Sequence, residues 1–559
     1  MQKKHLILLS VAAIALTSCS GKLGALSADN FTVTPNPLQS EVGQVPVTIN
    51  GTFPEKYMKK KAVVTVTPEL RYNGKVAKGQ SATFQGEKVL GNDQTINYKV
   101  GGNYTMKSNF NYEPDMQKSE LYLTFDAKVG KKSVEVPAVK VADGVIATSE
   151  LYKRTLTTAK PAMATDAFQR IVAQKQEANI QFLIQQANLR KSELQNNSVQ
   201  EFVRLLNDIA QNQEGLDLQN IEVSAYASPD GGYTLNEKLA GQRQSAASKY
   251  VQDQMKKAKI TSPVDTKYTA EDWEGFQQLV AASNIQDKDV ILRVLSMYQD
   301  PEEREQQIKN ISSAFRELAD GILPQLRRAR MIINYNVVGR SDDQILSQIN
   351  TDPSKLTIEE MLYGANLISN DNAKEAVYKK AAELYPNDAR ALNNIAMIEY
   401  AKGNYSEAQK WAQKALSVNS NLAEANANLG MLALQQGNVQ QAENYIAKAT
   451  GANGLNEVLG NLHLAQGKYA QAEQDFKNLN PNTNSAALAQ IMNKNYAQAA
   501  QTLAKVQNAD GVTEYLKALV AARSGNNSEA AAALKAAIAK DPTLSTYAAQ
   551  DLELLNVSK

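Results

Sequence analysis

The sequence predicts a multidomain protein with an N-terminal antiparallel β-sandwich, a central α+β domain with a helical insertion, and a C-terminal all-α solenoid. Three observations support this prediction. Residues 31–148 alternate apolar and polar side chains, residues 178–338 mix strand and helix patterns, and the C-terminal part carries an internal repeat. The 559 residues suit three or four domains of about 150 residues each. The 60 Lys and Arg residues nearly balance the 58 Asp and Glu residues, which argues against broad electrostatic binding of nucleic acid.

The N-terminus carries an export pattern. Two lysines precede an apolar run over residues 6–16, which is shorter than the roughly 20 residues that a membrane-spanning helix needs. The run leads into Leu-Thr-Ser-Cys19, which resembles the lipobox of bacterial lipoproteins. The resemblance implies a signal peptide over residues 1–18, a covalent lipid such as palmitate on Cys19, and a lipidated linker over residues 19–29. The alternative is an ordinary signal peptide in which the cysteine is coincidental.

The composition excludes most catalytic machinery. Cys19 is the only cysteine, and His463 is the only histidine beyond the leader. Once Cys19 is acylated, no thiol remains for a disulfide, a thiolate metal site or a nucleophile. The sequence also lacks a phosphate loop, a nucleophile elbow and metal-ligand spacing. We therefore expect no enzyme activity, no metal and no cofactor other than the covalent lipid.

The lipid also predicts a location. A lipid on Cys19 holds the chain on a membrane, and the resemblance to envelope lipoproteins implies the outer membrane. Lipoproteins that are exported to the cell surface in Bacteroidota carry acidic residues just after the cysteine. This chain has Ser-Gly-Lys-Leu-Gly there, so we expect a lipid-anchored protein on the periplasmic face.

Residues 30–148 read as strands. Apolar residues recur at every second position, and breaker-rich turns such as Gly101-Gly102-Asn103 separate the runs. Many short strands at regular spacing predict a β-sandwich, and the segment carries no pattern of reactive side chains. We expect it to act as a spacer or a protein-contact domain. The alternating residues are Val45, Val47 and Ile49, then Val64 and Val66, then Leu121, Leu123 and Phe125, then Val134, Val136, Val139 and Val141.

The central region, residues 165–340, alternates strands and helices. A strand over residues 221–226 runs into the breaker-rich turn 227–232, and a helix that contains Asn236 and Arg243 follows. An Arg-Arg segment and a last strand close the region. This order resembles the OmpA-like peptidoglycan-associated domain, and the Ala-Ser-Pro-Asp-Gly turn is similar to a variant in Bacteroidota lipoproteins. The resemblance implies a domain in which a turn aspartate and a helix arginine hold diaminopimelate of the peptidoglycan stem peptide.

The resemblance assigns a peptidoglycan-like site to four residues. Arg243 stands at the family's arginine position, and Asn236 matches its asparagine. The aspartate position, 15 residues before Arg243, holds Ser228, and Asp230 follows two residues later. A guanidinium suits a carboxylate because its planar donors reach both oxygens. Two roles for Arg243 stay open: a peptidoglycan ligand, or a retained residue that anchors the turn.

A second departure from the family is an insertion at about residues 260–323. Its apolar residues fall at helical spacing, which predicts helices that build a satellite core rather than a ligand site. These residues are Trp273, Phe276, Leu279, Val280, Ile291, Val294, Leu295 and Met297.

A 34-residue repeat indicates the fold of residues 345–559. Small residues recur where two helices cross closely, together with an aromatic or aliphatic residue at each packing position. This pattern is identified as the tetratricopeptide repeat, which implies a solenoid of helix pairs with a capping helix near residues 544–555. Gly403, Tyr405, Ala408 and Ala415 recur as Gly437, Val439, Ala442 and Ala449.

The repeat resemblance also implies a groove. Asn394 and Asn428 occupy equivalent positions on the first helices of their repeats, which line the concave face. In the family such asparagines often bond the backbone of an extended peptide, and the alternative is that they are solvated polar residues. The residues assigned to this repeat groove are Arg390, Asn394, Met397, Tyr400, Glu424, Asn428 and Met431, with Leu434 beside them.

Together the patterns predict an outer-membrane lipoprotein that acts as an envelope scaffold or adaptor. Its OmpA-like domain would bind peptidoglycan or a periplasmic protein, and its repeats would bind a protein or peptide partner. The alternative is an accessory subunit of a secretion or surface-organelle machine that does not bind peptidoglycan.

Overall fold

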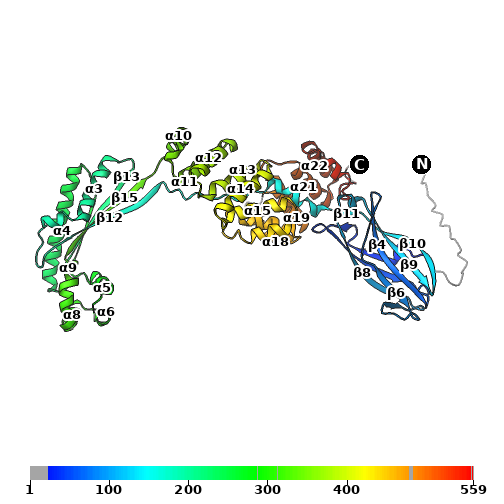
Figure 1. The fold of residues 1–559 in the computed structure, drawn as a ribbon, viewed down its shortest axis with the longest axis horizontal. Coiled ribbons are helices and arrows are strands. Elements are labelled where there is room, and N and C mark those ends of the chain that lie inside the picture. The colour runs from blue at the N-terminus through cyan, green and yellow to red at the C-terminus, as the bar shows by residue number, and fades with distance from the viewer. Residues whose placement is uncertain (1–22, 286, 311, 478–481, 556, 558–559) are drawn as a thin grey trace, which may run out of the picture. The chain divides into compact units, whose positions relative to one another are not determined.

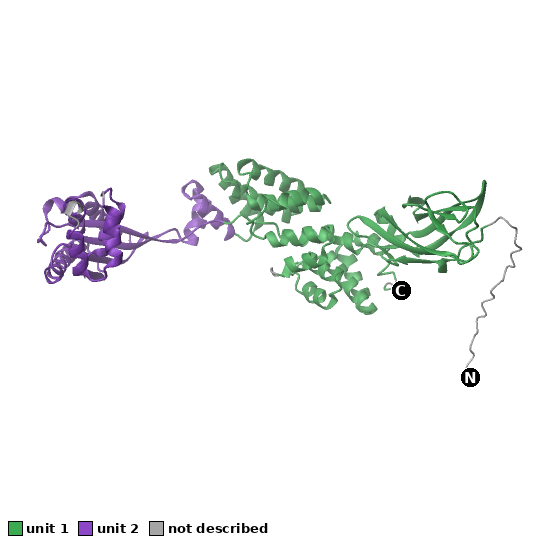
Figure 2. Ribbon diagram, turned by 90° about the horizontal axis from the view of Figure 1, so that it is seen from below, with its two compact units in different colours: residues 1–165, 368–559 green, residues 166–367 purple. Residues whose placement is uncertain are grey.

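The computed structural model describes residues 23–285, 287–310, 312–477, 482–555 and 557. Cys19 and the predicted signal peptide lie outside these residues. The chain divides into two compact units: residues 1–165 with 368–559, and residues 166–367 (Figure 2). Within the described ranges, no helix combines the length and the apolar character that crossing a bilayer requires.

The N-terminal part of the first unit is β-rich, which confirms that part of the predicted fold class (Figure 1). One sheet has the order β1-β3-β8, and another has the order β10-β9-β4-β6-β7 with β5 paired to β4. The short strands β2 and β11 pair in parallel. The strands are β1 (Phe31–Thr34), β2 (Leu38–Gln39), β3 (Gln44–Phe53), β4 (Ala62–Tyr72), β5 (Lys75–Lys78), β6 (Ala82–Gly86), β7 (Gln94–Ile96), β8 (Gly102–Asn111), β9 (Glu120–Val129), β10 (Lys132–Asp143) and β11 (Val145–Ile146).

Alternation along the strands produces the core of this region. In β4 every second residue is buried along the whole strand. Val47 and Ile49 of β3 belong to the same hydrophobic cluster as Val64 and Val66 of β4, although the two strands lie in different sheets. Burial of such a side chain contributes roughly 1.5–3 kcal/mol. The two sheets therefore share one core. Two 3-10 turns, η1 (Ala28–Asn30) and η2 (Pro114–Lys118), lie beside the strands.

Residues 147–165, which we call the strap, leave the β-rich region and run along the C-terminal helices. The strap starts with short helical turns and continues from residue 159 without helix or strand. Leu151, Tyr152 and Leu156 belong to the same hydrophobic cluster as the core of the C-terminal helices. The turns are η3 (Thr148–Leu151), α1 (Tyr152–Thr155) and η4 (Leu156–Thr158).

The second unit is built on a mixed sheet in the order β12-β15-β13-β14. β13 is parallel to β14 and antiparallel to β15, which pairs antiparallel with β12 along its whole length. Phe202 and Leu206 of α3 and Val251 of α4 share a core with Ile180 and Val223 of the sheet. The elements are β12 (Ile171–Gln181), α2 (Lys191–Leu194), α3 (Asn197–Gln211), β13 (Leu216–Tyr226), α4 (Tyr233–Ala258), β14 (Val264–Thr269) and β15 (Arg328–Val338).

A run of short helices separates β14 from β15. Phe276, Val280 and Leu295 centre a separate hydrophobic cluster there, in keeping with the helical spacing of the sequence. β14 lies inside residues 260–323, the range expected for the insertion, and the first helix after β14 begins at Trp273. The helices are α5 (Trp273–Ala282), α6 (Lys288–Met297), α7 (Pro301–Asn310), α8 (Ser312–Glu317), the π-helical turn η5 (Leu318–Ile322) and α9 (Leu323–Leu326); α10 (Asp342–Thr351), η6 (Pro353–Lys355) and α11 (Ile358–Asn366) close the unit.

The C-terminal part of the first unit is all-helical, which confirms the predicted solenoid region (Figure 1). Gly403, Gly437, Gly467 and Gly525 each follow the first helix of a pair with φ between 73° and 80°. This left-handed conformation favours glycine, which explains why the glycine recurs. The helices are α12 (Asp371–Leu384), α13 (Ala389–Ala401), α14 (Tyr405–Val418), α15 (Ala423–Gln435), α16 (Val439–Ile446), α17 (Leu455–Ala465), α18 (Tyr469–Lys477), α19 (Asn484–Met492), α20 (Tyr496–Ala504), α21 (Gly511–Arg523), α22 (Asn527–Lys540) and α23 (Leu544–Ala548).

We expect Gly460→Ala to lower the free energy of unfolding of the solenoid by about 1–3 kcal/mol. A Cβ atom at Gly460 would lie 2.6 Å from Cε1 of Phe476, whose ring is buried and cannot retreat easily. The matched control is Gly241→Ala in α4, where a Cβ meets no atom within 4 Å. There alanine should stabilise the helix by about 0.5–1 kcal/mol. Urea titrations read by hydrogen exchange of α17 and α4 measure both changes, and equal effects would contradict the close-crossing argument.

Candidate functional site

A pocket of about 350 Å³ in the second unit brings together all four residues of the predicted peptidoglycan-like site. Ser228 and Asp230 come from the turn after β13, and Asn236 and Arg243 come from α4. The structure adds Arg327, which follows α9 directly. We call this the two-arginine pocket.

Arg243 is held by backbone carbonyls and is only 1% exposed. Its Nε donates to the oxygen of Gln186 at 3.0 Å, Nη1 to that of Tyr226 at 2.9 Å, and Nη2 to that of Leu183 at 3.3 Å. These bonds use three of the five N–H groups of the guanidinium. Burial, with the nearby charge of Arg327, lowers the pKa of Arg243 to about 10. This geometry suits an anchor for the loop 182–186 and leaves two N–H groups beyond these three bonds.

Arg327 and Asp230 form an ion pair across the pocket. Nη2 of Arg327 lies 2.9 Å from Oδ2 of Asp230, and Nε donates to the Ser228 hydroxyl at 3.1 Å. The Ser228 hydroxyl in turn donates to Asp230, and the amide of Asn236 donates to the oxygen of Gly231 at 2.6 Å. Two guanidinium groups and one carboxylate give the lining a net charge of plus one. The pocket therefore favours an anionic or carboxylate-bearing ligand.

Four large apolar side chains around this pocket are exposed. Ile184 and Leu235 line it and are 58% and 45% exposed, and their neighbours Leu183 and Tyr233 are 46% and 51% exposed. We call these four residues the collar. They lie on the loop that Arg243 holds and at the start of α4. An exposed apolar group next to a charged pocket is the pattern of a binding surface.

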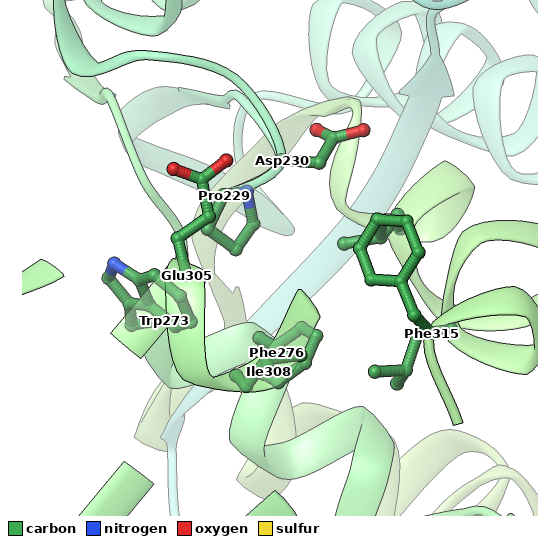
Figure 3. Close-up of a pocket in the computed structure, with 9 residues that line it drawn as sticks. Pro229, Asp230, Trp273, Phe276, Glu305, Ile308 and Phe315 are labelled. Atoms are coloured by element: carbon green, nitrogen blue, oxygen red, sulfur yellow. The ribbon is translucent and has the colours of Figure 1, made fainter. Parts of the chain in front are cut away.

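The helices between β14 and β15 line a neighbouring pocket of about 250 Å³ that shares Asp230 with the first (Figure 3). Its walls are mainly apolar, and the carboxylates of Asp230 and Glu305 belong to its lining. Glu305 pairs with Lys309 one helical turn away. Burial raises the pKa of Glu271, and its carboxylate accepts a hydrogen bond from the indole of Trp273. The other lining residues are Pro229, Trp273, Phe276, Ile308, Phe315, Leu318 and Leu323.

The repeat groove holds the strap. Asn394 pairs with both backbone groups of Ala164: Oδ1 accepts from its N–H at 2.9 Å, and Nδ2 donates to its oxygen at 2.9 Å. Asn428 does the same with Ala162, at 2.6 and 2.8 Å. The neighbouring Asn393 also donates to the oxygen of Ala162 at 3.1 Å. The backbone that these amides bond belongs to this chain itself.

The other groove residues divide between the strap and the solenoid. The Tyr400 hydroxyl donates to the oxygen of Leu156 at 3.1 Å, and Arg390 donates to that of Thr165 at 3.4 Å. Glu424 instead accepts from the backbone of Asn453 at 3.3 Å. Met431 is fully buried, Met397 is half-buried, and Leu434 is fully buried.

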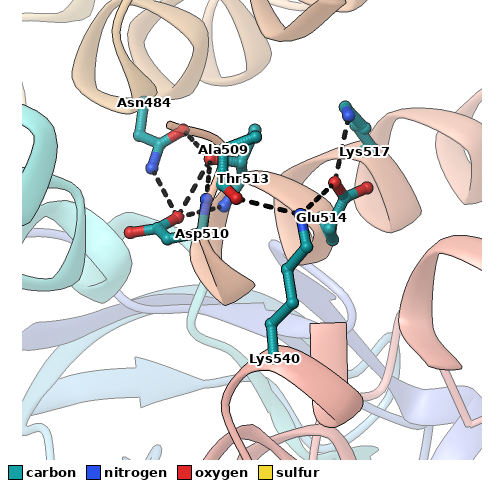
Figure 4. A network of polar contacts seen from close by, with 7 residues as sticks. All are labelled: Asn484, Ala509, Asp510, Thr513, Glu514, Lys517 and Lys540. Carbon is teal, nitrogen blue, oxygen red and sulfur yellow. Dashed lines mark hydrogen bonds and ion pairs between the residues drawn. The ribbon is translucent and has the colours of Figure 1, made fainter. Parts of the chain in front are cut away.

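The first half of the strap meets the last repeats. Thr157 donates to Asp510 at 3.1 Å, and the Thr158 hydroxyl accepts from the backbone of Asn484 at 3.3 Å. Asn484 and Asp510 belong to a polar network with Thr513 that joins α19 to α21 (Figure 4). From Thr157 onward the strap is therefore bonded along the repeats in reverse order, with its end at α13.

A buried carboxyl group lies under the middle of the strap. Glu457 of α17 accepts a hydrogen bond from the backbone of Lys160, and burial raises its pKa to about 7. Its Oε1 atom and Oδ1 of Asn461 have no hydrogen-bond partner among the described residues. Two acceptors without a donor favour the protonated form of the carboxyl group.

The described parts of the chain show no cluster of metal-ligating side chains. They contain no group of three or more His, Cys, Asp or Glu side chains placed to hold an ion.

Comparison with known proteins identifies the repeats. Models of the tetratricopeptide repeat match residues 389–426 and 427–479. A tetratricopeptide repeat protein from Parabacteroides merdae is 16% identical, with 39% of this chain and 91% of that chain covered and a TM-score of 0.28. PilF of Pseudomonas aeruginosa is 20% identical, with 39% and 99% covered and a TM-score of 0.27.

YrrB, described as a tetratricopeptide repeat protein with an unusual peptide-binding site, is 19% identical, with 37% and 97% covered and a TM-score of 0.19. No curated protein sequence matches this chain. The matched models and the observed helix pairs both concern only the C-terminal part of the chain. That part of the chain is a tetratricopeptide-repeat region, a fold that serves as a scaffold for protein or peptide binding.

Proposed function

We propose that this protein is an envelope scaffold that is anchored in the outer membrane by a lipid on Cys19 and binds peptidoglycan through its central domain. The two-arginine pocket carries the proposal, because it gathers Ser228, Asp230, Asn236 and Arg243 in one place. The Leu-Thr-Ser-Cys19 pattern supports the anchor, and the lack of acidic residues just after Cys19 supports the periplasmic face. The repeats supply the scaffold.

The pocket suits a zwitterionic group such as the free end of diaminopimelate. Asp230 and Arg327 already form an ion pair, so a ligand must break it. A zwitterion can replace that pair with two, because its carboxylate pairs with Arg327 and its ammonium with Asp230. Arg243 bonds backbone carbonyls with three of its five N–H groups. The other two add donors for the carboxylate. A ligand without a carboxylate gains only one of the two pairs.

Sedimentation with purified diaminopimelate-type peptidoglycan tests the proposal. We expect Arg327→Gln to reduce the bound fraction of the acyl-free mature protein about tenfold or more, since a charge-assisted bond contributes roughly 1.5–3 kcal/mol. The matched control is Arg204→Gln, because Arg204 is exposed on α3 and does not line the pocket. Peptidoglycan whose diaminopimelate carboxylate is amidated should bind as weakly as the variant does.

Two outcomes would contradict peptidoglycan binding: no sedimentation of the wild-type protein, or equal sedimentation of wild type and Arg327→Gln. A retained thermal transition in the variant confirms that any loss is not a folding defect.

The collar favours a second candidate, an accessory subunit of a secretion or surface-organelle machine. Four exposed apolar side chains beside the pocket suit a protein surface better than a glycan strand. In that case the wild-type protein should not sediment with peptidoglycan, and Ile184→Ser with Leu235→Ser should remove a stoichiometric partner from a co-purification.

A further inference from the structure

The strap saturates the amides that make the repeat groove a peptide-binding surface. The N–H and C=O groups of both Ala162 and Ala164 are paired with Asn428 and Asn394. Asn393 donates to the oxygen of Ala162, and its own side-chain oxygen accepts from Nδ2 of Asn428. All three asparagines are at most 2% exposed. A peptide from another molecule could bond them only after these contacts break.

The side chains of the strap fill the space that the groove offers. Ala162 and Ala164 are each 2% exposed, and Ala159 is 7% exposed. Nearer the last repeats, Leu151 and Leu156 are each 1% exposed and pack into the solenoid core. The groove is thus occupied by backbone contacts at its first repeats and by apolar contacts at its last repeats.

The start of the strap is also fastened to both of its neighbours. Ser149 of the strap bonds Ser40 of the β-rich region at 2.9 Å, and Glu150 accepts from the backbone of Gly43 at 2.9 Å. On the solenoid side, Tyr547 donates to the oxygen of Ala147 at 3.0 Å. Because the strap is covalently continuous at both ends, its effective concentration at the groove is on the order of millimolar. An external peptide competes poorly with such a ligand.

We propose that the repeat groove serves an intramolecular ligand, and that the solenoid is an internal clamp on the strap. Residues 159–165 stay bound in the groove, and protein partners meet the solenoid on its other surfaces. Every residue in this argument belongs to the first unit, so the proposal stands whether or not the second unit binds peptidoglycan.

Hydrogen exchange on the intact mature chain tests the clamp. We expect the amides of Ala162 and Ala164 to exchange as slowly as those of the solenoid core. In the double variant Asn394→Ala with Asn428→Ala they should exchange about tenfold to a hundredfold faster, because each lost partner leaves a buried backbone group unsatisfied.

The control is Asn426→Ala. Asn426 lies in the same helix as Asn428 and is as buried, but its amide donates to Leu422 within that helix. It should leave exchange of the strap unchanged. Exchange within seconds in the wild type, or equal acceleration by Asn426→Ala, would overturn the proposal.

A binding measurement tests whether an external peptide can replace the strap in the groove. A labelled synthetic peptide of residues 159–165 should not bind the intact chain at 100-fold molar excess of protein. Saturable binding of this peptide would mean that the groove opens to external ligands, and the internal clamp would be wrong.

Discussion

Replacing Arg243 with alanine is expected to lower the free energy of unfolding of the central domain by about 3–5 kcal/mol. The change removes one donor from each of the carbonyl groups of Gln186, Tyr226 and Leu183. It also removes one of the largest fully buried side chains of the protein and leaves a cavity beside Phe182. Urea titrations, with hydrogen exchange of β13 and α4 as the readout, measure the loss of unfolding free energy.

Arg243→Lys separates the charge from the geometry. Lysine keeps the positive charge, but its single ammonium cannot reach three carbonyl groups in the plane of a guanidinium. We expect a smaller but clear destabilisation and faster exchange in the loop 182–186. If the urea midpoint of Arg243→Ala equals that of the wild type, the anchoring role is wrong, and a direct ligand role gains support.

The two roles of Arg243 therefore need different experiments. A loss of peptidoglycan binding in Arg243→Ala would be ambiguous, because the same change loosens the loop that carries Leu183 and Ile184. Arg327 is the sharper probe, because its contacts in the pocket are to side chains, Ser228 and Asp230.

The local part of the pocket could be predicted from the sequence, and the rest could not. Ser228, Asp230, Asn236 and Arg243 lie within one strand-turn-helix segment, so their spacing brings them together once that segment folds. Arg327 is 97 residues from Asp230, and only the pairing of β15 with β13 carries it to the turn. No local pattern encodes such a contact.

The same reasoning explains why the sequence pattern does not separate β14 from the helices that follow it. The polar stretch Val264–Thr269 does not alternate, because β14 is an edge strand of its sheet and most of its side chains are exposed. Without an inward-facing apolar row, the period-two signal of a strand is absent. The helices of the repeats, in contrast, repeat their small residues locally, so both their type and their period were predictable.

The strap is the part of the fold that sequence patterns hide most completely. Its residues from 159 to 165 have neither helical nor strand periodicity, because backbone groups make most of their polar contacts. The partners lie 230 and 266 residues away. The asparagines of the groove were recognisable from their position in the repeat, but the identity of their ligand required the structure.

The free energy of unfolding of the solenoid is expected to depend on pH through the buried carboxyl group of Glu457. Its pKa rises from an ordinary value of 4.5 to about 7 in the folded chain because of burial, while Lys160 acts in the opposite direction. Between these values the unfolded chain ionises and the folded chain does not. This group's stabilisation is therefore complete below about pH 4.5 and is lost as the pH rises to about 7. At about 1.36 kcal/mol per pH unit, the loss is about 3 kcal/mol.

Glu457→Gln should remove that loss. Glutamine supplies an N–H donor where the protonated carboxyl group supplies an O–H, and Oδ1 of Asn461 lacks a partner among the described residues. The variant should match the wild type near pH 4.5 and exceed its stability by about 3 kcal/mol at pH 8. Urea titrations at both pH values, read by hydrogen exchange of α17 and the strap, give the difference directly. Other titrating groups cancel in this difference, including Asp551, whose pKa burial raises to about 6. A constant difference between the two proteins from pH 4.5 to 8 would show that Glu457 is ionised beneath the strap, and that the strap tolerates the charge.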